Sequence, residues 1–223
     1  LQPEFPEVPK DSLVVCSFGD ASANHSTAQG AINTAGWTAY QGVPLPLLFV
    51  CEDNGIGIST PTPEGWIAER FRNQPGLEYL SCNGLDIIDT YNVTKRAADF
   101  IRRYRKPVFL HKNCVRLYGH AGSDIQSAYL DKQEIERSET NDPLLHGAAL
   151  MIATGCMTSA EILNTYQSIE ARISRISAEV TTRPKLTNPD EVMESIVPPR
   201  RKVPSITPPS ASARQNLFSE DDR

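Results

Sequence analysis

Short apolar runs alternate along this chain with longer amphipathic stretches. Four runs, at residues 12–18, 45–51, 78–82 and 107–111, break abruptly into glycine, asparagine or other polar residues, as strands of a parallel sheet do. Helical spacing or capping residues mark the stretches between and after them. The expected helices cover residues 26–41, 63–72, 93–104, 142–154 and 158–181. Strands that alternate with helices predict an α/β fold with a parallel sheet.

The C-terminal part changes character. Thr158 and Glu161 have the spacing of a capping box, which predicts the start of a long helix. Apolar residues recur along this helix every three or four positions and form a narrow seam suited to one partner helix, within the subunit or at a dimer interface. The seam residues are Ile162, Tyr166, Ile169, Ile173, Ile176 and Val180. Prolines are frequent from residue 183 onward. We therefore expect one α/β domain over residues 1–182 and an extended arm or linker over residues 183–223.

Composition narrows the classes of partner. The 223 residues are 39% hydrophobic and carry a net charge of −5, which argues against a nucleic-acid-binding surface. Every apolar run is far shorter than the roughly 20 residues of a membrane helix, and the proline-rich, acidic opening does not resemble a signal peptide. The five cysteines lack a Cys-x-x-Cys spacing and suit buried thiols in a reducing compartment. We expect no nucleic-acid or membrane partner, and a cytoplasmic location, or the mitochondrial matrix in a eukaryote.

Polar motifs follow the first two expected strands. Gly19-Asp20-Ala21 comes after the first strand and Asp53-Asn54-Gly55 after the second. Ligands of open parallel sheets gather at the carboxyl ends of strands, and carboxylate and amide oxygens are suitable ligands for Mg²⁺. A Gly-Asp pair alone is more often a simple turn. Together with the Arg116-to-His120 segment after the fourth strand, the motifs predict a site for a divalent metal and a diphosphate.

These motifs resemble the thiamine diphosphate motif, in which a Gly-Asp-Gly triplet precedes a paired Asn. The segments 51–58 and 116–124 are similar to the alpha subunit of 2-oxo acid dehydrogenases, the decarboxylating first component of the pyruvate and branched-chain complexes. The similarity runs from about residue 13 to about residue 193 and corresponds to the second half of that subunit. It implies a diphosphate-binding α/β domain truncated at its N-terminus, and hence an incomplete alpha region.

The resemblance implies a role for particular residues. Asp20, the side chain of Asn54 and the main-chain carbonyl of Ile56 would bind Mg²⁺. Backbone N–H groups at the start of the next helix would bind the diphosphate, Arg116 would hold a phosphate, and His120 would take part in proton transfers during reductive acylation of a lipoyl group. The implied cofactor-binding residues are Gly19, Asp20, Ala21, Ser22, Asn54, Ile56, Arg116 and His120.

Two departures from the family pattern lie at this site. Ala21 stands where Gly is usual, which is acceptable if its φ is not positive, and Asp53 replaces the first Asn of the pair. The other histidines, His25, His111 and His146, lack zinc spacing and are expected to be structural.

The resemblance also implies an activity and partners. The chain would bind Mg-thiamine diphosphate for oxidative decarboxylation of a small 2-oxo acid and pass the acyl group to lipoyl. It would work with a beta subunit or fused beta region and a lipoyl-bearing acyltransferase, in an oligomer. Two alternatives stay open: another thiamine diphosphate enzyme of the transketolase or decarboxylase type, and a catalytically incomplete fragment that only binds partner subunits.

Overall fold

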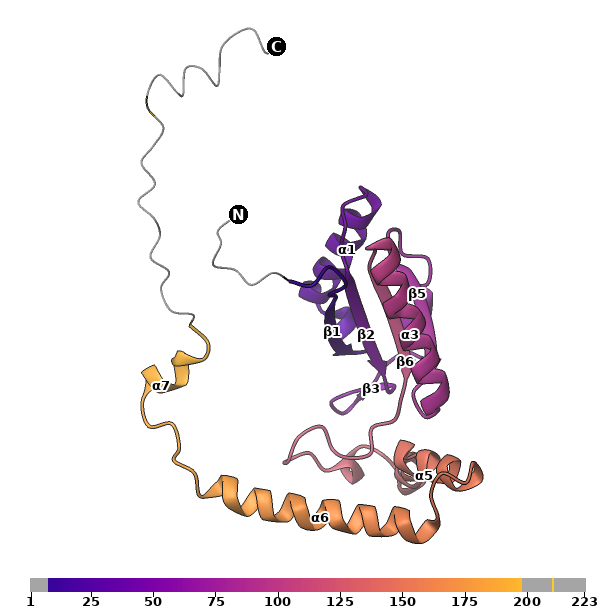
Figure 1. The fold of residues 1–223 in the computed structure, drawn as a ribbon, viewed down its shortest axis with the longest axis vertical. Helices are drawn as coiled ribbons and strands as arrows, with labels where there is room; N and C mark the ends of the chain where they lie inside the picture. The colour runs from indigo at the N-terminus through magenta and orange to yellow at the C-terminus, as the bar shows by residue number, and fades with distance from the viewer. Residues whose placement is uncertain (1–7, 198–209, 211–223) are drawn as a thin grey trace. The chain divides into compact units, whose positions relative to one another are not determined.

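The computed structural model describes residues 8–197 and residue 210. The chain has two compact units, Leu1–Tyr166 and Gln167–Arg223. The first unit contains a four-stranded sheet of β1 (Val14–Gly19), β2 (Leu47–Asp53), β5 (Glu78–Asn83) and β6 (Val108–Asn113). All neighbouring strands are parallel, in the order β1-β2-β6-β5 (Figure 1). The predicted α/β fold with a parallel sheet is confirmed.

Helices cover both faces of the sheet. One face packs against α1 (Ser26–Tyr40) and α2 (Trp66–Phe71) around Phe49 and Phe109. The opposite face packs against α3 (Ile87–Tyr104) around Leu80 and Leu110. The alternation of side chains along each strand supplies one apolar set to each helical layer. The core therefore forms two clusters, one on each side of the strands.

The first strand differs from its prediction as a buried strand. Among the described strands β1 pairs only with β2, and Val14 and Val15 are 63% and 58% exposed. Its apolar sequence is typical of a buried strand, but strand order places it at the edge of the sheet. Because order is set by pairing between distant segments, a local pattern cannot distinguish an edge strand from a central one.

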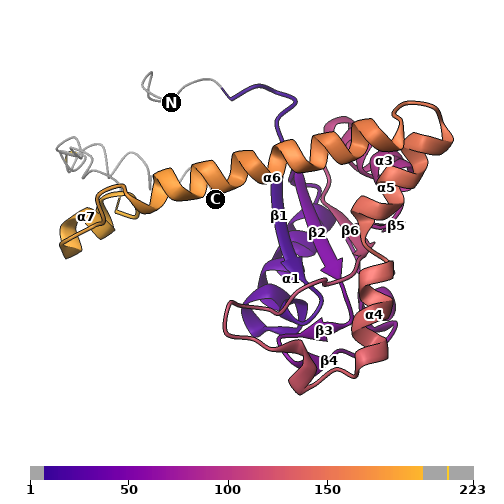
Figure 2. The same cartoon turned by 90° about the horizontal axis from the view of Figure 1, so that it is seen from below.

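Several element boundaries also differ. α3 begins at Ile87, six residues before the predicted start, because Asp86 caps it by accepting hydrogen bonds from the N–H groups of Ile88 and Asp89 at 2.8 and 3.1 Å. The unpredicted elements include the small hairpin of β3 (Ile56–Gly57) and β4 (Thr60–Pro61), and helix α4 (Lys132–Thr140). Figure 2 shows the hairpin just beyond the carboxyl end of β2.

The predicted C-terminal helices are present as α5 (Pro143–Ala153) and α6 (Ser159–Thr181), and the capping box of Thr158 and Glu161 forms. The apolar seam of α6 is exposed at five positions, so its partner helix stays a prediction. These positions are Tyr166, Ile169, Ile173, Ile176 and Val180. The expected arm contains one short helix, α7 (Pro189–Glu194), and residues 198–209 and 211–223 of the arm lie outside the described residues. No helix of the described part is long and apolar enough to cross a membrane.

Candidate metal and diphosphate site

The carboxyl ends of β1 and β2 bring the two polar motifs together. The strands pair in parallel with Gly19 opposite Glu52, so Asp20 and Asn54 leave the sheet at the same edge. Both line one cavity of about 890 Å³, together with Ile56, Arg116 and His120. Asp20 is 2% exposed, and its Oδ2 accepts a hydrogen bond from the hydroxyl of Thr62. Among the described side chains Thr62 alone bonds to this carboxylate, which leaves Oδ1 for another ligand.

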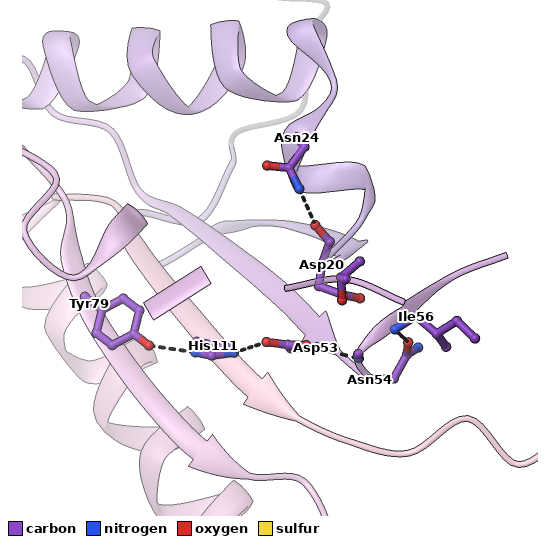
Figure 3. Close-up of polar contacts among 9 residues, drawn as sticks. Asp20, Asn24, Asp53, Asn54, Ile56, Tyr79 and His111 are labelled. Atoms are coloured by element: carbon purple, nitrogen blue, oxygen red, sulfur yellow. Dashed lines mark hydrogen bonds and ion pairs between the residues drawn. The ribbon is translucent and has the colours of Figure 1, made fainter. Parts of the chain in front are cut away.

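A tight turn follows β2 and carries the second motif (Figure 3). Asp53 Oδ1 accepts a hydrogen bond from Gly55 N at 3.2 Å, and Asn54 Oδ1 accepts one from Ile56 N at 3.1 Å. Gly55 has φ +76°, a left-handed conformation that favours glycine at this position. The Asn54 side chain is thus held at its own turn, and its amide oxygen has a second lone pair for a metal.

The diphosphate side lies between β1 and α1. Ser22–Asn24 forms a 3₁₀ turn after the triplet, and α1 starts at Ser26 as predicted, capped by the His25 ring, which accepts from Thr27 N at 3.2 Å. Ala21 and Ser22 therefore precede α1, whereas the resemblance implied N–H groups at the start of that helix. Ala21 has φ −61°, so an alanine fits without backbone strain at the position where the family usually has Gly. The N–H groups of Ala21 and Ser22 make no backbone hydrogen bond within the described chain. They remain available as donors to an anion.

Arg116 lies between the cavity and the loop that follows β6. Its Nη1 donates to the Ile58 carbonyl at 2.6 Å and its Nη2 donates to the Tyr129 hydroxyl at 2.7 Å. Its Nε is buried and has no protein partner. The predicted phosphate-binding residue therefore lines the cavity with its Nε unpaired, while its other two bonds hold the β3–β4 hairpin and the loop after β6.

His120 is exposed and lines the same cavity. Its backbone N–H donates to Asp124 Oδ2 at 2.6 Å, and the Tyr129 hydroxyl donates to the same oxygen at 2.7 Å. These two bonds hold the pKa of the Asp124 carboxyl below its ordinary value of 3.8, and the bond from the His120 N–H lowers it most. Asp124 fixes its own loop and so sets the position of His120.

Sequence reasoning missed a polar chain beneath the turn. Tyr79 Oη lies 2.6 Å from His111 Nδ1, and His111 Nε2 lies 2.8 Å from Asp53 Oδ2 (Figure 3). His111 is 5% exposed, as expected of a structural histidine. Thr62 was also missed. The sequence signal for His111 is a polar side chain within an apolar run, and the signal for Thr62 is a polar side chain beside Pro63. Both signals are too weak to identify a partner.

The donor set fits a magnesium diphosphate group. The cavity is lined by Asp20, whose buried carboxylate has a free oxygen, by Asn54 with its amide oxygen and by Ile56 with its main-chain carbonyl. The free N–H groups of Ala21 and Ser22 and the unpaired Nε of Arg116 belong to residues of the same lining. No cluster of three or more His, Cys, Asp or Glu side chains suited to a metal occurs in the described chain. A site with one carboxylate is consistent with that finding, since Mg²⁺ takes its remaining ligands from phosphate oxygens and water.

Comparison with known proteins decides the family. The model of the family described as dehydrogenase E1 component matches residues 8–188. The chain belongs to this family. It is 26% identical over 178 residues to the 2-oxoisovalerate dehydrogenase subunit alpha of Bacillus subtilis. The aligned residues cover 78% of this chain and 52% of the relative. It is 25% identical over 178 residues to the testis-specific mitochondrial pyruvate dehydrogenase E1 component subunit alpha of Homo sapiens, with 78% and 44% covered.

The chain spans about half the length of these relatives. Over that part, this E1 chain corresponds to an alpha subunit of thiamine diphosphate-dependent 2-oxo acid dehydrogenases. A third relative, the mitochondrial pyruvate dehydrogenase E1 component subunit alpha of Saccharomyces cerevisiae, is 30% identical over 153 residues, which cover 66% of this chain and 35% of the relative. The predicted family is confirmed.

Proposed function

We propose that this E1 chain binds thiamine diphosphate through Mg²⁺ at the carboxyl ends of β1 and β2. The observation that carries the proposal is the buried Asp20 carboxylate, which retains a free oxygen in the cavity that Asn54 and Ile56 also line. Asp20, the Asn54 side chain and the Ile56 carbonyl would hold the metal. The N–H groups of Ala21 and Ser22 would bind the diphosphate, next to Gly19 at the end of β1.

The bound cofactor would supply the carbanion and the electron sink that decarboxylation of a 2-oxo acid requires. The residues of this chain would orient it. Arg116 would donate to a phosphate from the cavity wall, and His120 would move a proton at the open side of the site while Asp124 holds its loop. We assign lipoyl as the acyl acceptor, and a beta region and a lipoyl-bearing acyltransferase as partners in an oligomer.

Family membership favours this proposal over a transketolase or decarboxylase activity. Transfer of the acyl group to lipoyl discriminates between them, because only the E1 reaction uses that acceptor. The half-length match favours a second candidate, in which this part of the subunit binds cofactor or partners without turnover by itself. In that case turnover would require addition of the complementary alpha and beta regions.

A calorimetric titration with thiamine diphosphate tests the site, with Mg²⁺ and with chelator. We expect binding that needs the metal and that disappears in Asp20→Ala. Asp86→Ala is the matched control, because Asp86 also accepts hydrogen bonds through its carboxylate but caps α3 and does not line the cavity. Metal-independent binding, or equal binding by Asp20→Ala and the wild type, would refute the assigned ligands. Absence of binding by the wild type would refute a cofactor site that is sufficient within this chain.

A further inference from the structure

His111 is a buried imidazole on β6. Phe109 of the same strand and Phe49 and Cys51 of neighbouring β2 face the same helical layer, so most of its surroundings are apolar. Burial removes water from both ring nitrogens of the imidazole, and this costs free energy unless both find hydrogen-bond partners. An apolar side chain would fill this position without that cost. Packing alone therefore does not explain the residue.

The hydrogen bonds of His111 have a defined direction. Because the Asp53 carboxylate is an acceptor, His111 Nε2 carries the proton and donates to Asp53 Oδ2 at 2.8 Å. His111 Nδ1 then accepts a hydrogen bond from the Tyr79 hydroxyl at 2.6 Å. Burial raises the pKa of Tyr79, which keeps its hydroxyl protonated as a donor. The chain from Tyr79 to Asp53, which we call the relay, crosses β5, β6 and β2 and ends at the last residue of β2 (Figure 3).

The relay continues into the metal and diphosphate site. The second oxygen of Asp53 accepts from Gly55 N at 3.2 Å, and the Gly55 carbonyl accepts from Thr62 N at 2.9 Å. The Thr62 hydroxyl donates to the Asp20 carboxylate. Asn54 lies inside this turn. One carboxylate, that of Asp53, therefore joins the rigid sheet to the turn that carries the candidate ligands.

We propose that His111 is a positioning residue for this site. Held by Tyr79, it fixes the Asp53 carboxylate and thereby the conformation of residues 53–56, which places Asn54 and Ile56 beside Asp20. The inference rests on the proposed function, because it concerns the ligands assigned there. A histidine that serves only the core would affect the stability of the fold and leave cofactor affinity unchanged.

Three variants separate positioning from packing. His111→Leu fills the position with an apolar side chain of similar size and removes the N–H donor to Asp53. His111→Gln can place an amide N–H toward Asp53. Leu110→Ala is the matched control, because Leu110 is 1% exposed on the same strand but faces the α3 layer. Calorimetry gives the affinity for thiamine diphosphate with Mg²⁺, and thermal unfolding gives stability.

We expect His111→Leu to weaken Mg²⁺-dependent binding by about 10–100-fold, as loss of outer-shell partners does at metal sites. His111→Gln should retain most of the affinity, and Leu110→Ala should lower the melting temperature with little change in affinity. Tyr79→Phe removes only the outer bond of the relay, so we expect an intermediate loss, and this variant keeps the test available should His111→Leu not fold. Wild-type affinity in His111→Leu, or an equal loss in Leu110→Ala, would overturn the inference.

Amide hydrogen exchange distinguishes failure of this inference from failure of the proposed function. Without cofactor, we expect the Gly55 and Ile56 amides to exchange faster in His111→Leu than in wild type, His111→Gln or Leu110→Ala. If the wild type binds no cofactor, the proposed function fails for this chain, and the exchange rates still decide whether the relay holds the turn. Unchanged exchange at Gly55 and Ile56 in His111→Leu would overturn the inference.

Discussion

Gly57 of β3 lies against Ala21 of the diphosphate turn so closely that no side chain fits between them. A Cβ added at Gly57 would lie 2.5 Å from the Ala21 Cβ. Non-bonded carbon atoms pack at about 3.5–4.0 Å, so one segment must move by roughly 1 Å or more. Gly57 is not among the glycines with positive φ, and the strain in Gly57→Ala would come from this contact.

The expected cost follows from that overlap. Overpacking of this kind costs about 1–3 kcal/mol, and each kcal/mol lowers the melting temperature of a chain of this size by roughly 2–4 °C. If Ala21 moves, its N–H and that of Ser22 move away from the diphosphate. The same 1–3 kcal/mol would then lower cofactor affinity by about 5- to 150-fold.

A double-mutant cycle measures the contact by thermal unfolding and calorimetry. Ala21→Gly removes the opposing Cβ and leaves the new methyl of Gly57→Ala with ordinary contacts, at 3.9 Å from the Thr60 carbonyl and 4.0 Å from the Ala21 Cα. We expect the double variant to recover about 1–3 kcal/mol of coupling energy. Gly30→Ala is the control, because it adds a methyl to α1 with no atom within 4 Å. Wild-type stability of Gly57→Ala, or simple additivity in the double variant, would refute the reasoning.

Two further predictions concern titratable groups. The folded-state pKa of Asp124 lies below 3.8, so the stabilisation from its two bonds should be present above about pH 3.8 and be lost as the pH falls through the lowered pKa. The amide resonance of His120 should report this loss in the wild type and not in Asp124→Asn. Burial raises the pKa of the Cys51 thiol, and burial together with the Glu52 charge raises that of Cys114 to about 11. A thiol reagent near neutral pH should therefore label exposed Cys16 and Cys156 first by mass spectrometry, and equally fast labelling of Cys51 would contradict the described core.

The candidate site was predictable to the extent that its residues follow strands. Asp20 and Asn54 each come directly after an apolar run, and the carboxyl ends of parallel strands lie at one edge. The sequence does not reveal that the Thr62 hydroxyl reaches Asp20, because the hairpin that precedes Thr62 has no strong pattern of its own. The relay was unpredictable for a different reason. Tyr79, His111 and Asp53 belong to three strands, and only the register of those strands brings the three residues into contact.

By itself, the sequence of this E1 chain determined the kinds of element, the parallel sheet and the polar motifs at the strand ends, because hydrophobic period and turn residues act locally. Tertiary structure alone decided that β1 is an edge strand, that Ala21 meets Gly57, and that His111 lies between Tyr79 and Asp53. These outcomes depend on which distant strands pair and in what register. That choice is made by the packing of two helical layers on the whole sheet, which no single segment encodes.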